Sequence, residues 1–298
     1  MSTVKMQSVR LPIDQNGNVA QLHGLGVQCF DGIYYAYGEN KVNGGLFQGV
    51  VCYTSSDLHD WVNHGIVLAP RSTGLLATDT IAERPKVLQC PTTGEYVMFI
   101  HAERHDYNYA HVAVAVSDNP LGPFRFLFSM QPFGNISRDI GVFQDSDGTG
   151  YLLSEDREHG THIYRLSEAY HSVVEDVVCL KGANYQYGYE SPTMIKCNGF
   201  YYWFGSQLTG WDSNDNMFAT ASTIEGPWSE WKPFAPVGSY TFDSQCDLVL
   251  PLPDGQFLYI GDRWNPDDLG NSPTLWLPIT LKDREAVLHW HDEWTYEI

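Results

Sequence analysis

The sequence lacks the segments that would carry a protein into or through a membrane. No apolar run approaches the length of a membrane span, and residues 1–20 are too polar for a signal peptide. A long amphipathic period of 3.6 residues is also missing, which excludes a helical bundle. As written, the chain is expected to be soluble and cytoplasmic, or secreted if a signal has been removed.

Basic residues are scarce as well. The 298 residues include 17 Lys and Arg against 36 Asp and Glu, for a formal net charge of −19 at pH 7. Phosphates would be repelled, so neither nucleic acid nor a membrane surface is expected as a partner. A neutral oligosaccharide or polysaccharide fits better, because aromatic rings, 14% of the chain, can stack on a sugar while acids and amides hold its hydroxyls. The alternative is that the acidity serves only solubility.

Motifs for cofactors, metals and covalent nucleophiles are absent. The sequence has no G-x-G-x-x-G, no P-loop and no nucleophile elbow. Its six cysteines form no C-x-x-C pair and mostly fall in strand patterns, so reduced core thiols are expected. His23, His101, His105 and His111 lack metal-ligand spacing. We therefore expect no cofactor and no metal.

What the sequence does contain is a repeat of tight turns between aromatic and β-branched runs. The turns are Asp31-Gly32, Thr93-Gly94, Asp147-Gly148, Asn198-Gly199 and Asp254-Gly255. Their glycines are 62, 54, 51 and 56 residues apart, a period typical of a β-propeller blade. The repeat predicts an all-β fold, a single five-bladed β-propeller over residues 1–298, with blades near 21–70, 80–130, 137–182, 188–236 and 243–290.

Two polar positions recur around these turns. The strand leading into each turn begins with a polar residue, which we call the leading ring: His23, Glu83, Asp139, Glu190 and Gln245. The strand leaving each turn ends with another, the returning ring: Glu39, Glu103, Glu155, Gln207 and Asp262. Antiparallel pairing places both rings on one face. If the leading strand is innermost in its blade, the leading ring lines the mouth of the central channel.

Glu190 is the candidate general acid. It begins a strand beside Tyr189 and shortly before the bend fixed by Pro192, a setting that removes water from a carboxyl and favours its protonated form. A cap or salt bridge at the strand end is the alternative reading. Arg138 stands next to Asp139 and is expected to keep that carboxyl ionised.

These motifs resemble the family 43 glycoside hydrolases and, within them, the exo-β-1,3-galactanase group. The matching stretches include His23-Gly24, Tyr37-Gly38-Glu39, Glu83-Arg84-Pro85, Ser137-Arg138-Asp139, Glu190-Ser191-Pro192, Leu208-Thr209-Gly210-Trp211 and Gly261-Asp262-Arg263-Trp264. The resemblance implies an inverting glycosidase that releases galactose from the end of β-1,3-galactan, the backbone of arabinogalactan. It gives Glu190 the acid role, and it makes Asp139 the residue that holds a sugar hydroxyl and tunes that acid.

The resemblance leaves the base open. Most family members carry a base Asp at the start of the first blade, where this chain has His23 and no carboxylate. The galactanase group is similar in this respect and has Gln or Glu at the place of Gln245. A neutral amide is a weak base, so either Gln245 orients the water, in one version as its imidic tautomer, or Glu83 accepts the proton. Both are catalytic candidates.

Loop placement and the resemblance also suggest residues that contact the sugar. The candidates are Tyr107, Tyr109, Thr209, Trp211, Glu39 and His23. Each could instead be rim packing, and the sequence does not decide which tyrosine faces the pocket. Two other functions remain open: an α-L-arabinofuranosidase or β-xylosidase, which the missing first-blade Asp argues against, and a non-catalytic carbohydrate-binding propeller. The trio of Glu83, Asp139 and Glu190 argues against the second.

Overall fold

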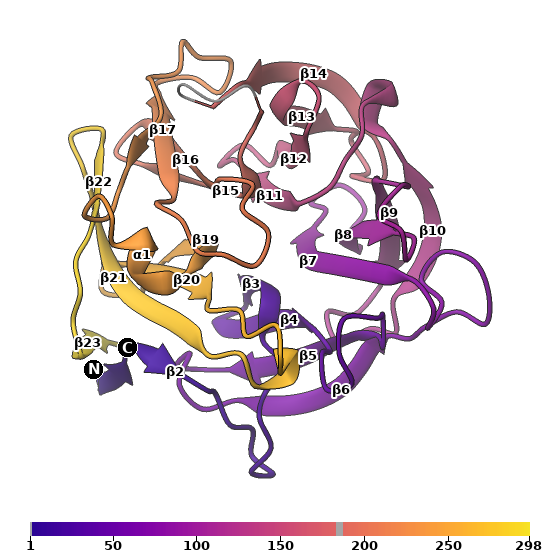
Figure 1. The fold of residues 1–298 in the computed structure, drawn as a ribbon, viewed down its shortest axis with the longest axis horizontal. Coiled ribbons are helices and arrows are strands. Elements are labelled where there is room, and N and C mark those ends of the chain that lie inside the picture. Colours follow the sequence, from indigo (N-terminus) through magenta and orange to yellow (C-terminus); the bar gives the residue numbers. More distant parts are fainter. Residues whose placement is uncertain (1, 183–186) are drawn as a thin grey trace.

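The protein folds as five antiparallel sheets arranged around one central axis (Figure 1). A computed structural model describes residues 2–182 and 187–298. Most strands alternate between two buried faces, because each sheet packs against the sheets of its two neighbours. The prediction of an all-β, five-bladed propeller is confirmed.

Each blade is built from consecutive strands. The first blade contains β3 (His23–Phe30), β4 (Ile33–Glu39), β5 (Val50–Ser55) and β6 (Val62–Leu68), and the second contains β7 (Ile81–Gln89), β8 (Tyr96–Glu103), β9 (His111–Ser117) and β10 (Arg125–Met130). The third contains β11 (Ile140–Gln144), β12 (Gly150–Asp156), β13 (Gly160–Leu166) and β14 (Val173–Leu180). The fourth contains β15 (Glu190–Cys197), β16 (Phe200–Ser206), β17 (Met217–Ala221) and β18 (Lys232–Pro233). The fifth contains β19 (Gln245–Pro251), β20 (Phe257–Asp262), β21 (Thr274–Lys282) and β22 (Glu285–Leu288). The short helices are η1 (Pro132–Gly134), α1 (Tyr240–Asp243) and η2 (Leu269–Asn271).

The leading strand of every blade is the innermost one. Strands β3, β7, β11, β15 and β19 each lie at one end of their sheet and adjoin one another around the channel. They can do so because small residues allow close approach. A Cβ on Gly141, for example, would come within 1.9 Å of the Pro192 carbonyl oxygen on the next inner strand.

The N-terminal segment completes the fifth blade, which the repeat did not predict. Strand β2 (Val9–Arg10) pairs with β21, and β1 (Thr3–Gln7) pairs with β23 (Glu293–Glu297). The two ends of the chain therefore lie side by side at the rim of the disc (Figure 1). The pairing of β2 with β21 joins the fifth blade to the segment that leads into the first blade.

The cysteine prediction is partly wrong. All six thiols are free, and Cys52, Cys90, Cys197 and Cys246 are buried in the packing between blades, but Cys29 and Cys179 are exposed. Strand residues alternate between faces, and these two lie near strand ends or on the outermost strand, where one face meets solvent. In the described part of the chain, no helix is long and apolar enough to cross a membrane.

Candidate active site

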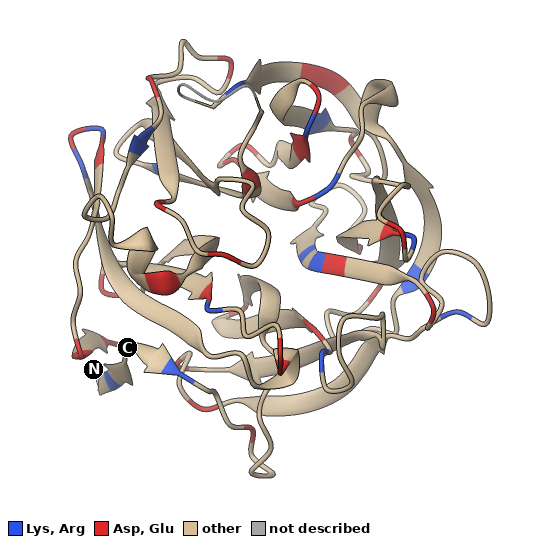
Figure 2. Cartoon of the chain, viewed as in Figure 1, with Lys and Arg blue, Asp and Glu red and all other residues tan. Residues whose placement is uncertain are grey.

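The leading and returning rings meet at one mouth of the channel, as the strand register requires. His23 pairs with Glu39 and Gln245 pairs with Asp262. In the third blade the Glu155 amide donates to the Asp139 carbonyl at 2.9 Å. The second and fourth blades are offset, because Glu83 pairs with His101 and Glu190 pairs with Ser206. Acidic residues accordingly gather around the channel (Figure 2).

Bulges turn the ring side chains into the channel mouth. The pairing register breaks directly after His23, Glu83 and Glu190. Within these breaks Arg84 and Ser191 adopt positive φ values of 56° and 51°, a conformation that is costly for residues other than glycine. Such strain at several equivalent positions is typical of functional sites.

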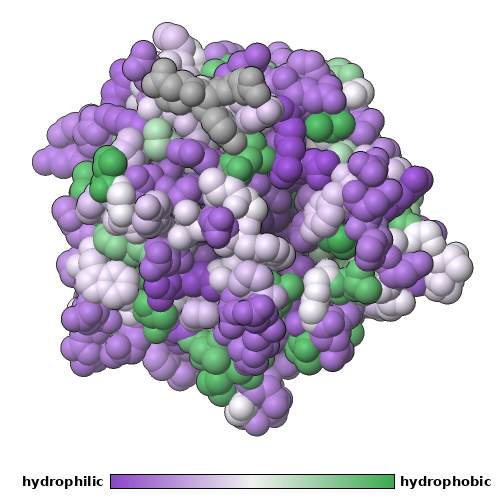
Figure 3. Space-filling model, in the orientation of Figure 1, coloured by the Kyte–Doolittle hydropathy of each residue, from purple (hydrophilic) through white to green (hydrophobic). Residues whose placement is uncertain are grey.

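The site is a blind cavity of about 380 Å³. Its lining residues are Glu39, Glu83, Arg84, His101, Tyr107, Arg138, Asp139, Arg157, Glu190, Gly210, Trp211, Gln245 and Trp264. Arg84 forms an ion pair with Asp247, which lines a separate cavity at the opposite mouth. This ion pair closes the channel below the site, and the space-filling view shows the hollow at the centre of the disc (Figure 3). A volume of this size suits a small part of a polymer, such as its terminal unit.

Glu190 is placed to hold a proton. Its side chain is almost completely buried, and burial together with the charges of Asp139 and Glu155 raises its pKa well above the usual value. Its Oε1 accepts a hydrogen bond of 2.8 Å from Gln245 Nε2. The second oxygen, Oε2, lies 3.6 Å from an Arg157 nitrogen. A protonated carboxyl fixed at one oxygen can donate from the other.

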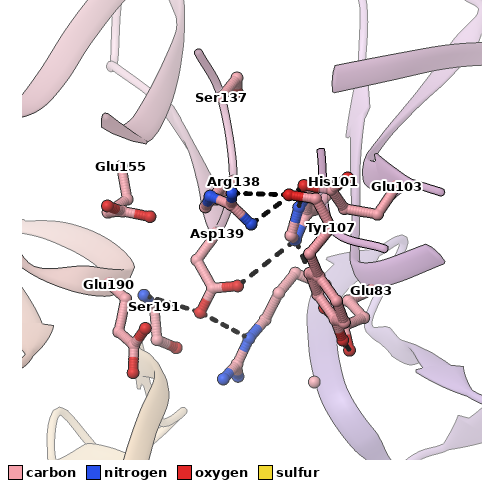
Figure 4. A network of polar contacts seen from close by, with 12 residues as sticks. Glu83, His101, Glu103, Tyr107, Ser137, Arg138, Asp139, Glu155, Glu190 and Ser191 are labelled. Carbon is pink, nitrogen blue, oxygen red and sulfur yellow. Dashed lines mark hydrogen bonds and ion pairs between the residues drawn. The ribbon is translucent and has the colours of Figure 1, made fainter. Parts of the chain in front are cut away.

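Asp139 is held ionised, but by a different cation from the one that the sequence predicts. Its Oδ2 lies 3.2 Å from Arg84 Nε and accepts a bond of 3.0 Å from the Ser191 amide. Although burial acts the other way, Arg84 and then His101 hold the pKa of Asp139 well below its usual range. Arg138 instead donates to Glu103 at 3.0 Å (Figure 4).

Glu83 is the second ionised carboxyl. It lies 3.4 Å from His101 Nδ1 and 3.8 Å from Lys41 Nζ, and it accepts a bond of 3.1 Å from the Tyr107 hydroxyl. Burial would raise the pKa of Glu83, but His101 and Lys41 more than offset this and lower it. Burial would lower the pKa of His101, but the carboxyls around it, Asp139 first, raise it well above the usual value. Figure 4 shows Glu83 and Glu190 on opposite sides of Asp139.

One group in this network has the donor types of a metal site. Ligand atoms of Glu83, His101 and Asp139 lie within 4.8 Å of one another. However, Arg84 and Lys41 already bring positive charge to these two carboxyls. The carboxyls around His101 raise its pKa, which favours an imidazolium that pairs with them. The cluster is therefore best described as an ion-pair network.

The amide of Gln245 is fully hydrogen-bonded, and its orientation follows from its partners. Its Oε1 accepts from Arg84 and, at 2.9 Å, from Trp264 Nε1. Its Nε2 donates to Glu190 and, at 3.0 Å, to Ser206 Oγ. Arginine and tryptophan side chains only donate, so the oxygen must face them. An imidic tautomer would carry a hydrogen on that same oxygen, where the two partners offer no acceptor.

The predicted sugar contacts divide into two groups. Tyr107, Trp211 and Glu39 line the cavity, and Trp211 is half exposed at its rim. His23, Tyr109 and Thr209 are not among the lining residues. His23 is buried 3.9 Å from Asp262. Tyr109 stacks on His111 at 3.8 Å, and Thr209 bonds within its own loop. Of the two tyrosines, it is Tyr107 that faces the pocket.

Four cavity residues were not singled out from the sequence: Arg84, His101, Arg157 and Trp264. A signal existed for two of them. Arg157 and Trp264 each follow a returning-ring residue by two positions, in the loop that leaves the strand at the channel mouth. Arg84 reaches the channel only through its positive φ. A positive φ cannot be predicted from the sequence when the residue is not glycine.

Comparisons with known proteins agree with this geometry. The family described as "Glycosyl hydrolases family 43" matches residues 27–246. A candidate exo-β-1,3-galactanase of Bifidobacterium bifidum is 58% identical, with a TM-score of 0.94, over 96% of this chain and 97% of that one. Exo-β-1,3-galactanases of Phanerochaete chrysosporium and Clostridium thermocellum are 35% and 33% identical, with TM-scores of 0.93 and 0.90. The matches cover 99% and 97% of this chain and 69% and 66% of theirs. Among curated proteins, none matches the sequence.

Proposed function

The chain belongs to the glycosyl hydrolases of family 43, and on this premise we propose that it hydrolyses β-1,3-galactan from the chain end and releases galactose with inversion. The Phanerochaete enzyme, whose structures contain galactose and β-1,3-galactotriose, supports this substrate over arabinofuranosides and xylosides. A cavity of about 380 Å³ that the Arg84–Asp247 ion pair closes from below supports an exo action, because its size suits a terminal sugar unit. The partner is a neutral saccharide chain.

One feature carries the proposal: a single cavity holds two carboxyls whose pKa values are shifted in opposite directions. Burial, Asp139 and Glu155 raise the pKa of Glu190, whereas His101 and Lys41 more than offset burial and lower the pKa of Glu83. Inverting hydrolysis needs such a pair, an acid that protonates the leaving oxygen and a base that activates water on the opposite sugar face. Glu190 would give its proton to the leaving oxygen, and Asp139 would hold a sugar hydroxyl while raising the pKa of Glu190.

The hydrogen bonds of Gln245 favour Glu83 as the proton acceptor. The oxygen of the amide is occupied by two donors and its nitrogen donates to Glu190, so no lone pair is free to take a proton from water. Its role would then be to hold the Glu190 Oε1, which leaves the acidic proton on Oε2 facing the leaving group. Glu83 has the lowered pKa that an ionised acceptor needs.

The product of hydrolysis tests the proposed function. Purified protein incubated with linear β-1,3-galactan should release galactose, and proton NMR of the earliest time points should show the α-anomer, because inversion of a β-linkage gives α. Nitrophenyl arabinofuranoside and xyloside should react at least about a hundredfold more slowly, which corresponds to about 2.7 kcal/mol of barrier. Binding of galactan without any product would instead support the carbohydrate-binding alternative.

Replacing Gln245 with Glu should move the pH profile. A carboxylate at the position of the amide nitrogen, 2.8 Å from Glu190 Oε1, would raise the pKa of the acid, because two carboxyls at this distance share a proton. The alkaline limb of kcat/KM should shift upward by about one pH unit or more, with a fall in rate. Ser206→Ala removes an uncharged partner of the same amide and should leave the limb in place. An unchanged profile for Gln245→Glu would place Gln245 outside the reaction.

A further inference from the structure

Glu155, a member of the returning ring, has no role in the mechanism above, yet its setting is unusual. It lies near the end of β12 and is completely buried. Neither of its carboxylate oxygens has a hydrogen-bond partner among the described residues. An unpaired buried carboxylate is costly, and a fold retains one only where something compensates or where function requires it.

The nearest cation of Glu155 is shared with the proposed acid. Arg157 Nε lies 3.6 Å from Glu155 Oε1, and a terminal nitrogen of the same guanidinium lies 3.6 Å from Glu190 Oε2. Glu155 lies in β12 and Arg157 begins the turn that follows this strand, which brings the guanidinium back over the carboxyl. One half-exposed arginine is thus placed between two buried carboxyls, and Figure 4 shows Glu155 on the Glu190 side of Asp139.

We propose that Glu155, acting through Arg157, is a positioning residue that governs how firmly Glu190 keeps its proton. The inference rests on the proposed function of Glu190 as the acid. When Glu155 is ionised, its charge opposes ionisation of Glu190 and neutralises much of the Arg157 charge. When Glu155 is protonated or removed, Arg157 is left to stabilise the Glu190 carboxylate, so the acid loses its proton more easily.

The charges around Glu155 set the pH at which it changes between its protonated and ionised forms. The groups that face it are Arg157, Asp139, Arg138, His101 and Glu190. Burial first, with a further contribution from Asp139, raises the pKa of Glu155 to about 7, although the three cations act against this. Above that pH Glu155 becomes charged. In the same range Glu190 is most prone to lose its proton, and the Glu155 charge opposes that loss. The pair therefore extends the active range of the acid toward alkaline pH.

Two substitutions with opposite expected effects test the proposal. Glu155→Gln should lower the Glu190 titration midpoint by about one pH unit, because the opposing charge is lost while Arg157 remains. Arg157→Met should raise the midpoint by a similar amount, and this half-exposed side chain can be replaced without disturbing the core. Glu158→Gln, an exposed carboxyl of the same segment, is the matched control and should change nothing.

The readout should be direct as well as kinetic. Carbon-13 NMR of labelled glutamate carboxyls follows the Glu190 titration, assigned by its disappearance in Glu190→Gln, and needs no substrate. The alkaline limb of kcat/KM should move with it. Opposite NMR shifts without any galactan hydrolysis would support the Glu155–Arg157 pair and count against the proposed function. An unmoved midpoint in both variants, or shifts of the same sign, would overturn the pair, as would a loss of kcat that is equal at every pH.

Discussion

Replacing Glu190 with Gln is expected to lower kcat on β-1,3-galactan about a thousandfold or more, the usual contribution of a general acid. Gln has the shape of Glu and keeps an oxygen that can accept the bond from Gln245 Nε2, so the fold and the cavity should be retained. What is lost is the acidic proton for the leaving oxygen. The measurement is the initial rate of galactose release, with the melting temperature followed in parallel.

A substrate with a better leaving group separates acid catalysis from a structural effect. In a dinitrophenyl galactoside the leaving group, dinitrophenolate, departs without being protonated. The variant should therefore lose far less activity on this substrate than on galactan. Glu158→Gln, on the surface, should behave like the wild type on both substrates. If Glu190→Gln retained galactan activity within about tenfold, or about 1.4 kcal/mol of barrier, another residue would have to be the acid.

Replacing Arg84 with Met should produce the largest loss of stability. The buried guanidinium contacts Asp139, Asp247 and Asp262, and removing the partner of buried carboxylates typically costs about 3–5 kcal/mol. Urea unfolding should show this loss in the free energy of unfolding at pH 7. Arg165→Met, which breaks only the exposed pair with Glu175, should cost less than about 1 kcal/mol.

The Arg84 deficit should depend on pH in a definite direction. In the wild type Arg84 depresses the pKa of Asp139, so its contribution is present above the unfolded pKa and is lost as pH falls. In the variant the pKa values of Asp247 and Asp262, already raised by burial, rise further without the cation. The folded variant then binds more protons than the unfolded chain, so its stability falls as pH rises. The deficit should be larger at pH 8 than at pH 5; a deficit that did not change with pH would mean that these carboxyls are not Arg84's main contribution.

The sequence predicted the fold because a propeller is repetitive. Turns such as Asp147-Gly148 and Asn198-Gly199 mark each hairpin, and the polar residue that begins each leading strand precedes its turn by a nearly fixed offset. Antiparallel geometry alone then places the leading and returning rings on one face. The repeat could not predict that β2 closes the fifth blade, because this strand is far from its partner β21 in sequence and carries no copy of the repeat.

Electrostatic partners were harder to predict than positions. The nearest cation to Asp139 in sequence is Arg138, whereas the nearest in space is Arg84, which comes from another blade and reaches Asp139 through a positive φ. The pKa of Glu155 likewise depends on burial and on charges from two blades at once. Sequence spacing describes one strand at a time, and the charges that set protonation in this cavity come from several.

The bulges behind the leading ring have a consequence for how such a scaffold changes over evolutionary time. In four inner strands the register breaks within a few residues of the ring position, so the side chain in the cavity is decoupled from the apolar run that packs between neighbouring blades. One ring position can exchange acid for amide or imidazole without repacking the core. The first blade carries His23 and the fifth Gln245, and the ring residues of these four strands can differ while the architecture stays constant.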